Sequence, residues 1–195
     1  MRIGLFGGTY DPVHHAHLAV ARAAAERFAL DKVLLIPAAS PPHKGLSSAS
    51  YADRLNMVRL AVGKDPLLAA SDLERGTGRS YSILTVERVK ADLQEDDELF
   101  FIIGADAFEE IETWYRWRDL LRSVEFIVVT RPGYTYDVPE GAITHEMGGL
   151  SLPVSSSDLR QKLARGEAPA EVPAAVRAYI TEKGLYRQLA GEPKV

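Results

Sequence analysis

Hydrophobic residues follow two alternating patterns along this chain. Short continuous apolar runs are typical of strands that are buried on both faces of a sheet. They occur at Ile3–Phe6, Val33–Pro37, Leu67–Ala70, Leu99–Ile103 and Phe126–Thr130. Between most of them, apolar residues at helical spacing predict helices at Leu18–Phe28, Tyr51–Val62, Tyr81–Leu93 and Ala107–Leu121. The alternation predicts an α/β fold: one doubly wound, mostly parallel sheet covered by helices on both faces.

The C-terminal part continues with helices only. Val154 to Tyr186 predicts two of them, separated by Gly166–Pro169 and ending after Gly184. We find no internal repeat, so residues 1–190 are predicted to form a single domain, followed by a tail at 191–195. In such sheets ligands bind beyond the carboxyl ends of the strands, which places the expected site in the loops that follow them.

The segment from Gly7 to His17 is the strongest functional signal. The first strand enters a turn at Gly7, Gly8 and Thr9, and His14 and His17 follow at the start of a helix. A spacing of three places both imidazoles on one helix face, beside unpaired amides and the positive end of the helix dipole. The segment therefore predicts a phosphate site. A purely steric turn with solvated histidines explains each residue singly, but explains their coincidence less well. Neither a Walker A loop nor G-x-G-x-x-G is present.

A second candidate phosphate site lies near the C-terminus. Ser155, Ser156, Ser157 and Arg160 directly follow an apolar segment and begin a predicted helix. Ser155 or Ser156 suits a helix N-cap. The hydroxyls, the helix amides and the guanidinium would also bind phosphate. The residues alone leave both interpretations open.

Polar and aromatic groups follow other strands. Asp106 suits either a ribose hydroxyl or a helix N-cap, and Arg131 ends the fifth predicted strand. Trp114 and Tyr115 are either a stacking platform or part of the core. The segment Ser80–Ser82 predicts a helix N-terminus with spare amides.

The loop after the second strand carries a stiff pair of prolines. His43 and Lys44 follow Pro41 and Pro42, which presents two potentially cationic side chains together. A solvated proline-rich loop is the alternative.

Composition narrows the function classes. The net charge of −4 gives no support for a general binder of nucleic acid or anionic membranes. The absence of cysteine excludes disulfides, thiolate metal sites and a cysteine nucleophile. No apolar run approaches the length of a membrane span and the chain starts as a strand, so we expect a cytoplasmic protein.

Taken in order, these motifs resemble those of bacterial nicotinate-nucleotide adenylyltransferases, over nearly the whole chain. The first motif alone resembles the wider nucleotidyltransferase superfamily, with its H-x-G-H signature and Rossmann-like fold. Three positions depart from the family pattern: Ala16 replaces a glycine, and Ser82 and Ser157 each replace a threonine. The motifs are Gly7–His17, Pro41–Lys44, Ser80–Ser82, Gly104–Asp106, Thr113–Tyr115, Arg131–Gly133 and Val154–Arg160.

The resemblance implies that ATP and nicotinate mononucleotide react to give nicotinate adenine dinucleotide and pyrophosphate, in NAD biosynthesis. It implies that His14 and His17 act at the ATP phosphates, and that ATP is held by Gly7, Gly8, Thr9, His14, His17, Asp106, Ser155, Ser156, Ser157 and Arg160. It implies that the mononucleotide is held by His43, Lys44, Tyr81, Ser82, Trp114, Tyr115 and Arg131. Mg²⁺ is expected on the triphosphate, with no metal site built by protein side chains.

Alternative functions remain open at this point. Nicotinamide mononucleotide or phosphopantetheine could replace the acceptor, or the chain could be a non-catalytic nucleotide sensor. The sequence leaves open whether the chain forms a homo-oligomer.

Overall fold

The computed structural model describes residues 1–40, 49–76, 78–131, 133–150 and 153–187. Within these ranges one six-stranded sheet has the order β3-β2-β1-β4-β5-β6. All neighbouring strands pair in parallel. The strands are β1 Arg2–Gly8, β2 Lys32–Pro37, β3 Leu68–Ala70, β4 Glu98–Gly104, β5 Glu125–Val129 and β6 Thr144–Met147. The strand order reverses between β1 and β4, which confirms the predicted doubly wound sheet and marks its switch point.

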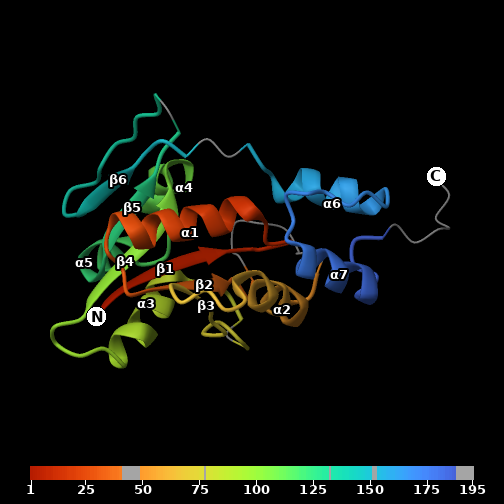
Figure 1. Cartoon of the computed structure of the whole chain (residues 1–195). Coiled ribbons are helices and arrows are strands. Elements are labelled where there is room, and N and C mark those ends of the chain that lie inside the picture. Colours follow the sequence, from red (N-terminus) through yellow and green to blue (C-terminus); the bar gives the residue numbers. More distant parts are fainter. Residues whose placement is uncertain (41–48, 77, 132, 151–152, 188–195) are drawn as a thin grey trace.

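Helices cover both faces of the sheet. They are α1 His15–Arg27, α2 Tyr51–Val62, α3 Ser82–Ala91, α4 Ala105–Glu109, α5 Trp117–Ser123, α6 Ser156–Ala164 and α7 Ala174–Lys183, with a 3₁₀ turn at Ile111–Thr113. The two C-terminal helices lie together beyond the carboxyl end of β1 (Figure 1). Among the described residues, none of the helices has the length and apolar character needed to span a membrane.

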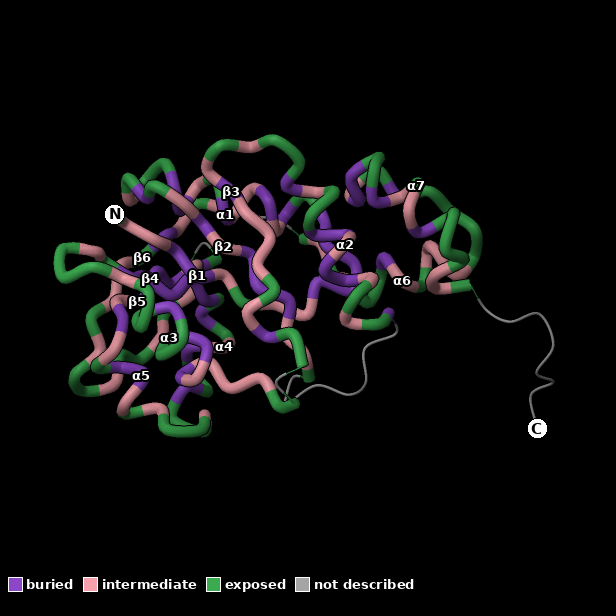
Figure 2. The backbone as a smooth tube through the Cα atoms, turned by 90° about the horizontal axis from the view of Figure 1, so that it is seen from below, coloured by how far each residue is buried: buried purple, intermediate pink, exposed green. Residues whose placement is uncertain are grey.

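The alternating side chains of β4 divide the core into two clusters. Phe100 and Ile102 join the cluster that includes α1, α2 and α7. Phe101 and Ile103 join the cluster on the other face, with α3, α4 and α5. Successive side chains of a strand point to opposite faces, so an uninterrupted apolar run is what a strand buried on both sides requires. Figure 2 shows the resulting burial along the central strands.

One prediction about the fold is wrong, and one strand was not predicted. The helix predicted at Ala107–Leu121 is divided into α4, the 3₁₀ turn and α5. Arg116 stands just before α5 with a φ of +53°, a left-handed conformation that a continuous helix excludes. The second difference is β6, an edge strand of mostly polar residues that carries no apolar run.

Candidate nucleotide-binding site

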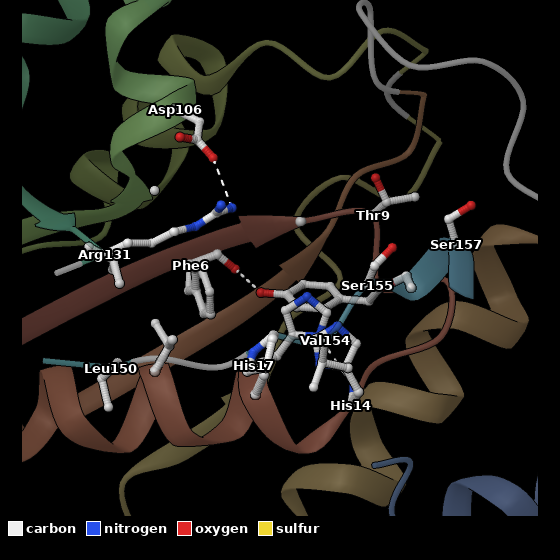
Figure 3. A pocket seen from close by; sticks show the side chains of 18 of the residues that line it. Phe6, Thr9, His14, His17, Asp106, Arg131, Leu150, Val154, Ser155 and Ser157 are labelled. Atoms are coloured by element: carbon white, nitrogen blue, oxygen red, sulfur yellow. Dashed lines mark hydrogen bonds and ion pairs between the residues drawn. The ribbon is translucent and has the colours of Figure 1, made fainter. Parts of the chain in front are cut away.

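A cavity of about 1050 Å³ opens at the carboxyl ends of β1, β4 and β5. Every residue predicted to bind ATP lines it: Gly7, Gly8, Thr9, His14, His17, Asp106, Ser155, Ser156, Ser157 and Arg160. Figure 3 labels Thr9, His14, His17, Asp106, Ser155 and Ser157 among the side chains that line it. The switch point of the sheet is therefore where the chain gathers the predicted phosphate-binding groups.

His14 and His17 lie against one another at the start of α1 (Figure 3). Their ring centroids are 3.7 Å apart and the rings are nearly parallel, which confirms that they share one helix face. The backbone amide of His14 donates a hydrogen bond to Nδ1 of His17 at 3.2 Å. Because Nδ1 of His17 accepts this bond, the neutral ring carries its proton on Nε2.

His14 is buried and neutral. Burial, together with the nearby His15, lowers the pKa of His14 to about 4. Its Nδ1 atom is buried and has no hydrogen-bond partner among the described residues. Buried polar atoms are nearly always paired, so this nitrogen, in a side chain that lines the cavity, is one that a ligand could satisfy.

The amides at the start of α1 differ from the prediction. The His15 amide donates to the carbonyl of Glu171 at 2.8 Å, and the His17 amide donates to the carbonyl of His14 at 3.0 Å. The expectation that the first-turn amides are all unpaired is therefore wrong. The first turn of α1 therefore has fewer unpaired amides than predicted.

The second predicted cradle lies across the cavity at the start of α6. The Ser155 hydroxyl caps the helix by accepting from the Asp158 amide, and the Ser156 hydroxyl donates to the carbonyl of Pro12 at 3.2 Å. Arg160 donates through Nη1 to the carbonyl of Asp11 at 2.8 Å. The capping interpretation is thus confirmed, while the same residues also line the cavity.

Asp106 and Arg131 form an ion pair at 3.2 Å, and both side chains are exposed. Asp106 lies in the first turn of α4, whose N-cap is Gly104, so the alternative that Asp106 caps the helix is wrong. The pair joins the segments that follow β4 and β5. Arg131, which was predicted to bind the mononucleotide, also lines the cavity that the predicted ATP-binding residues form.

Four other described residues predicted to bind the mononucleotide, Tyr81, Ser82, Trp114 and Tyr115, do not line this cavity. Tyr81 is the N-cap of α3, which confirms the helix N-terminus predicted at Ser80–Ser82, and its ring lies 4.6 Å from that of Tyr115. Trp114 packs edge-on against Phe101 with centroids 6.4 Å apart. The side chains of Tyr81, Ser82, Trp114 and Tyr115 are thus separate from the 1050 Å³ cavity. His43 and Lys44 lie outside the described residues.

Sequence reasoning missed Arg54, which belongs to none of the motifs described above. It is 1% exposed and donates to the carbonyl of Thr9 at 2.8 Å and to that of Ala49 at 3.3 Å. Met57 and Val58, three and four positions further along α2, are buried. That spacing places Arg54 on the buried face of the helix and was the available signal.

Apolar residues were also missed because they are scattered along the sequence. Four of the apolar residues that line the cavity are Val20, Val129, Leu150 and Val154. They come from α1, the end of β5 and the segment before α6, and only the fold brings them together. Among the described residues no group of three or more His, Cys, Asp or Glu side chains could hold a metal ion.

Comparison with known proteins first defines the class. A family model described as cytidylyltransferase-like matches residues 5–162, which include both sides of the cavity. The fold and the site are thus those of a nucleotidyltransferase. A protein of Solibacter usitatus named "Probable nicotinate-nucleotide adenylyltransferase" is 52% identical over 95% of this chain and 100% of its own length. A protein of the same name from Citrifermentans bemidjiense is 41% identical over 95% of this chain and 98% of its own.

This chain therefore belongs to the nicotinate-nucleotide adenylyltransferase family. The fold is also that of the Plasmodium falciparum nicotinic acid mononucleotide adenylyltransferase complexed with NaAD, with a TM-score of 0.76 and 18% identity. That comparison covers 95% of this chain and 97% of the other. The roles of individual residues and the cytoplasmic location stay predictions.

Proposed function

We propose that this chain transfers the adenylyl group of ATP to nicotinate mononucleotide, releasing pyrophosphate and forming nicotinate adenine dinucleotide. One observation carries the proposal. The stacked pair His14 and His17 at the start of α1 lines the same cavity as the serines and Arg160 at the start of α6. Such an arrangement suits a triphosphate held at both of its ends.

The reaction needs positioning more than proton transfer. A phosphate oxygen of the mononucleotide attacks the α-phosphorus, a new P–O bond forms, and the bond to the pyrophosphate oxygen breaks. The attacking phosphate is anionic at neutral pH, so neither a general base nor a protein nucleophile is required. The enzyme contributes by aligning the two substrates and by stabilising charge on the phosphate oxygens.

We assign the Nε2–H group of His17 to a non-bridging oxygen of the α-phosphate, because its Nδ1 is held by the His14 amide. His14, which burial keeps neutral at pH 7, lies against it as a second donor or acceptor. Ser155, Ser157 and the N–H groups of Arg160 that do not bind Asp11 are assigned to the β- and γ-phosphates.

The nucleoside would lie against the apolar residues that line the cavity. The apolar side chains of Val20, Leu150 and Val154 suit a purine ring, and the Asp106 carboxylate suits ribose hydroxyls. Mg²⁺ would be held by phosphate oxygens and water, where it supplies charge neutralisation to the triphosphate. Trp114 and the amides near Ser82 and Tyr115 remain our candidates for the pyridine ring and its carboxylate.

A substrate panel tests the proposal. The protein is incubated with ATP, Mg²⁺ and, in turn, nicotinate mononucleotide, nicotinamide mononucleotide and phosphopantetheine, and pyrophosphate is measured. We expect the highest rate with nicotinate mononucleotide. A preference for another acceptor would assign a related adenylyltransferase activity. ATP binding without pyrophosphate release with any acceptor would contradict the proposal in favour of a nucleotide sensor.

A further inference from the structure

The turn between β1 and α1 is held by hydrogen bonds from distant parts of the chain. Its carbonyl oxygens at Thr9, Asp11 and Pro12 accept from Arg54, Arg160 and Ser156, respectively. The turn leads directly into His14, the N-cap of α1. The position of the two histidines therefore depends on how this turn is held.

The side chain of Asp11 is a further fixed point of the turn. It is 2% exposed, and its Oδ1 accepts from the Ala49 amide at 3.2 Å and from the Tyr186 hydroxyl at 2.6 Å. Tyr186 is separated from Asp11 by almost the whole chain. Burial and the bond to Asp11 raise the pKa of Tyr186 well above its ordinary value, so the phenol stays protonated and donates.

The end of α7 brings Tyr186 to this place. Gly184 adopts a left-handed conformation with a φ of +64°. The Leu185 amide donates to the carbonyl of Ile180, and the Gly184 amide donates to that of Thr181. These are the two bonds of a Schellman motif, which ends the helix and turns the chain back. Leu185 and Tyr186 both pack against the core, and this packing holds the tyrosine against the turn between β1 and α1.

We propose that Tyr186 is a positioning residue for the ATP phosphates, acting through Asp11 on the turn that carries His14 and His17. Tyr186 itself does not line the cavity. This inference rests on the proposed function where it concerns kcat/KM. Where it concerns the affinity for an ATP analogue, it rests on the geometry alone. It links the C-terminal segment of the chain to the chemistry at the first βα turn.

A second tyrosine of the same region supplies a matched control. The Tyr179 hydroxyl, on α7, donates to Oδ1 of Asp53 on α2 at 2.8 Å, and Tyr179 is also partly buried. Neither Tyr179 nor Asp53 lines the cavity. Tyr179→Phe removes this bond and the one that the Tyr179 hydroxyl accepts from Asn56 Nδ2 at 3.3 Å, whereas Tyr186→Phe removes the bond to Asp11. Only the bond to Asp11 reaches the turn between β1 and α1.

We expect both variants to fold, with similar losses in Tm of about 2–4 °C. Tyr186→Phe should lower kcat/KM for ATP about tenfold, since small displacements of catalytic groups are costly. Its KM for nicotinate mononucleotide should stay within about twofold of wild type. Tyr179→Phe should leave both values unchanged. Equal kinetic effects of the two variants, or none with Tyr186→Phe, would overturn the proposal.

Calorimetric titration with a non-hydrolysable ATP analogue keeps the test independent of turnover. If wild type proves inactive, the proposed function fails, yet Tyr186→Phe should still bind the analogue more weakly than Tyr179→Phe. Equal affinities would overturn the positioning role by itself. In an Asp11→Ala background, adding Tyr186→Phe should cause no further loss of analogue affinity, whereas an additive loss would show that Tyr186 does not act through Asp11.

Discussion

The ATP side and the predicted mononucleotide side of the site are built differently. On the ATP side, the turn before α1 is buried, and its carbonyls and the Asp11 carboxylate are paired with Arg54, Arg160 and Tyr186. On the mononucleotide side, Tyr115 is 52% exposed, and its ring meets Tyr81 without forming part of the cavity.

The difference indicates how the two substrates are handled. Charge stabilisation is most effective when donors are fixed before the substrate arrives, and the buried hydrogen bonds of the ATP side supply that rigidity. Recognition of a flat ring by stacking requires an accessible aromatic face. We therefore expect substitutions on the ATP side to reduce kcat, and substitutions on the mononucleotide side to raise one KM.

His17→Ala should show the largest effect. Removing a fixed donor at the α-phosphate should lower kcat about 10²–10³-fold, while the fold persists because His17 is only partly buried. His15→Ala is the matched control, since His15 is in the same turn, is exposed and does not line the cavity. Steady-state kinetics of pyrophosphate release measure both. A folded His17→Ala protein with wild-type kcat would show that the ATP side works without this donor.

Lowering the pH should reduce the free energy of unfolding because His14 is buried in its neutral form. The folded protein protonates His14 only near pH 4, whereas an unperturbed imidazole has a pKa of 6.5. Between these values the unfolded chain binds more protons, so the free energy of unfolding falls as the pH falls, and above pH 6.5 the effect vanishes. Between pH 7 and 4.5 wild type should lose about 2 kcal/mol more than His14→Asn. Urea unfolding at both pH values measures this, and equal losses would mean that His14 is not held neutral.

The enzyme should prefer the mononucleotide whose pyridine ring carries a carboxylate to the one whose ring carries a carboxamide. Amides at a helix start are donors in a positive potential, and hydrogen bonds to a charged group contribute about 1.5–3 kcal/mol. Nicotinate mononucleotide should therefore exceed nicotinamide mononucleotide about ten- to a hundredfold in kcat/KM at fixed ATP. Equal values would show that α3 does not read the carboxylate, while leaving adenylyl transfer intact.

Trp114→Ala should give the smallest effect. Loss of an offset stack costs about 0.5–1.5 kcal/mol, so KM for the mononucleotide should rise about two- to tenfold with KM for ATP unchanged. Trp114→Phe, which keeps an aromatic face, should recover part of that loss. If both KM values rise together, or if Tm falls steeply, Trp114 serves the core through its contact with Phe101.

Most of the cavity lining could be predicted from the sequence because its signals are local. Gly7 to His17 and Ser155 to Arg160 are contiguous segments, and parallel strands bring their ends to one edge of the sheet. Local patterns also predicted α2 from Tyr51 to Val62 as the structure has it. The bond between Tyr186 and Asp11 could not be read in this way, because it joins distant segments and depends on how α7 packs.

Other differences have similar causes. Strand β6 pairs at the sheet edge through backbone hydrogen bonds and needs few apolar side chains, so Thr144–Met147 gave no signal. The break before α5 depends on the left-handed conformation of Arg116. Arginine is not a helix-breaking residue, so nothing in the sequence indicated this break. Arg54 was missed because a charged residue is not expected on the buried face of a helix.

Isotope labelling tests the central claim most directly, because it follows the phosphorus atom that we assign to His17. The protein is incubated with nicotinate mononucleotide and ATP carrying radioactive phosphorus at either the α- or the γ-position. The account predicts that α-label appears in the dinucleotide and γ-label in pyrophosphate. Transfer of γ-label to the mononucleotide, or recovery of the α-label only in AMP, would contradict adenylyl transfer at this site.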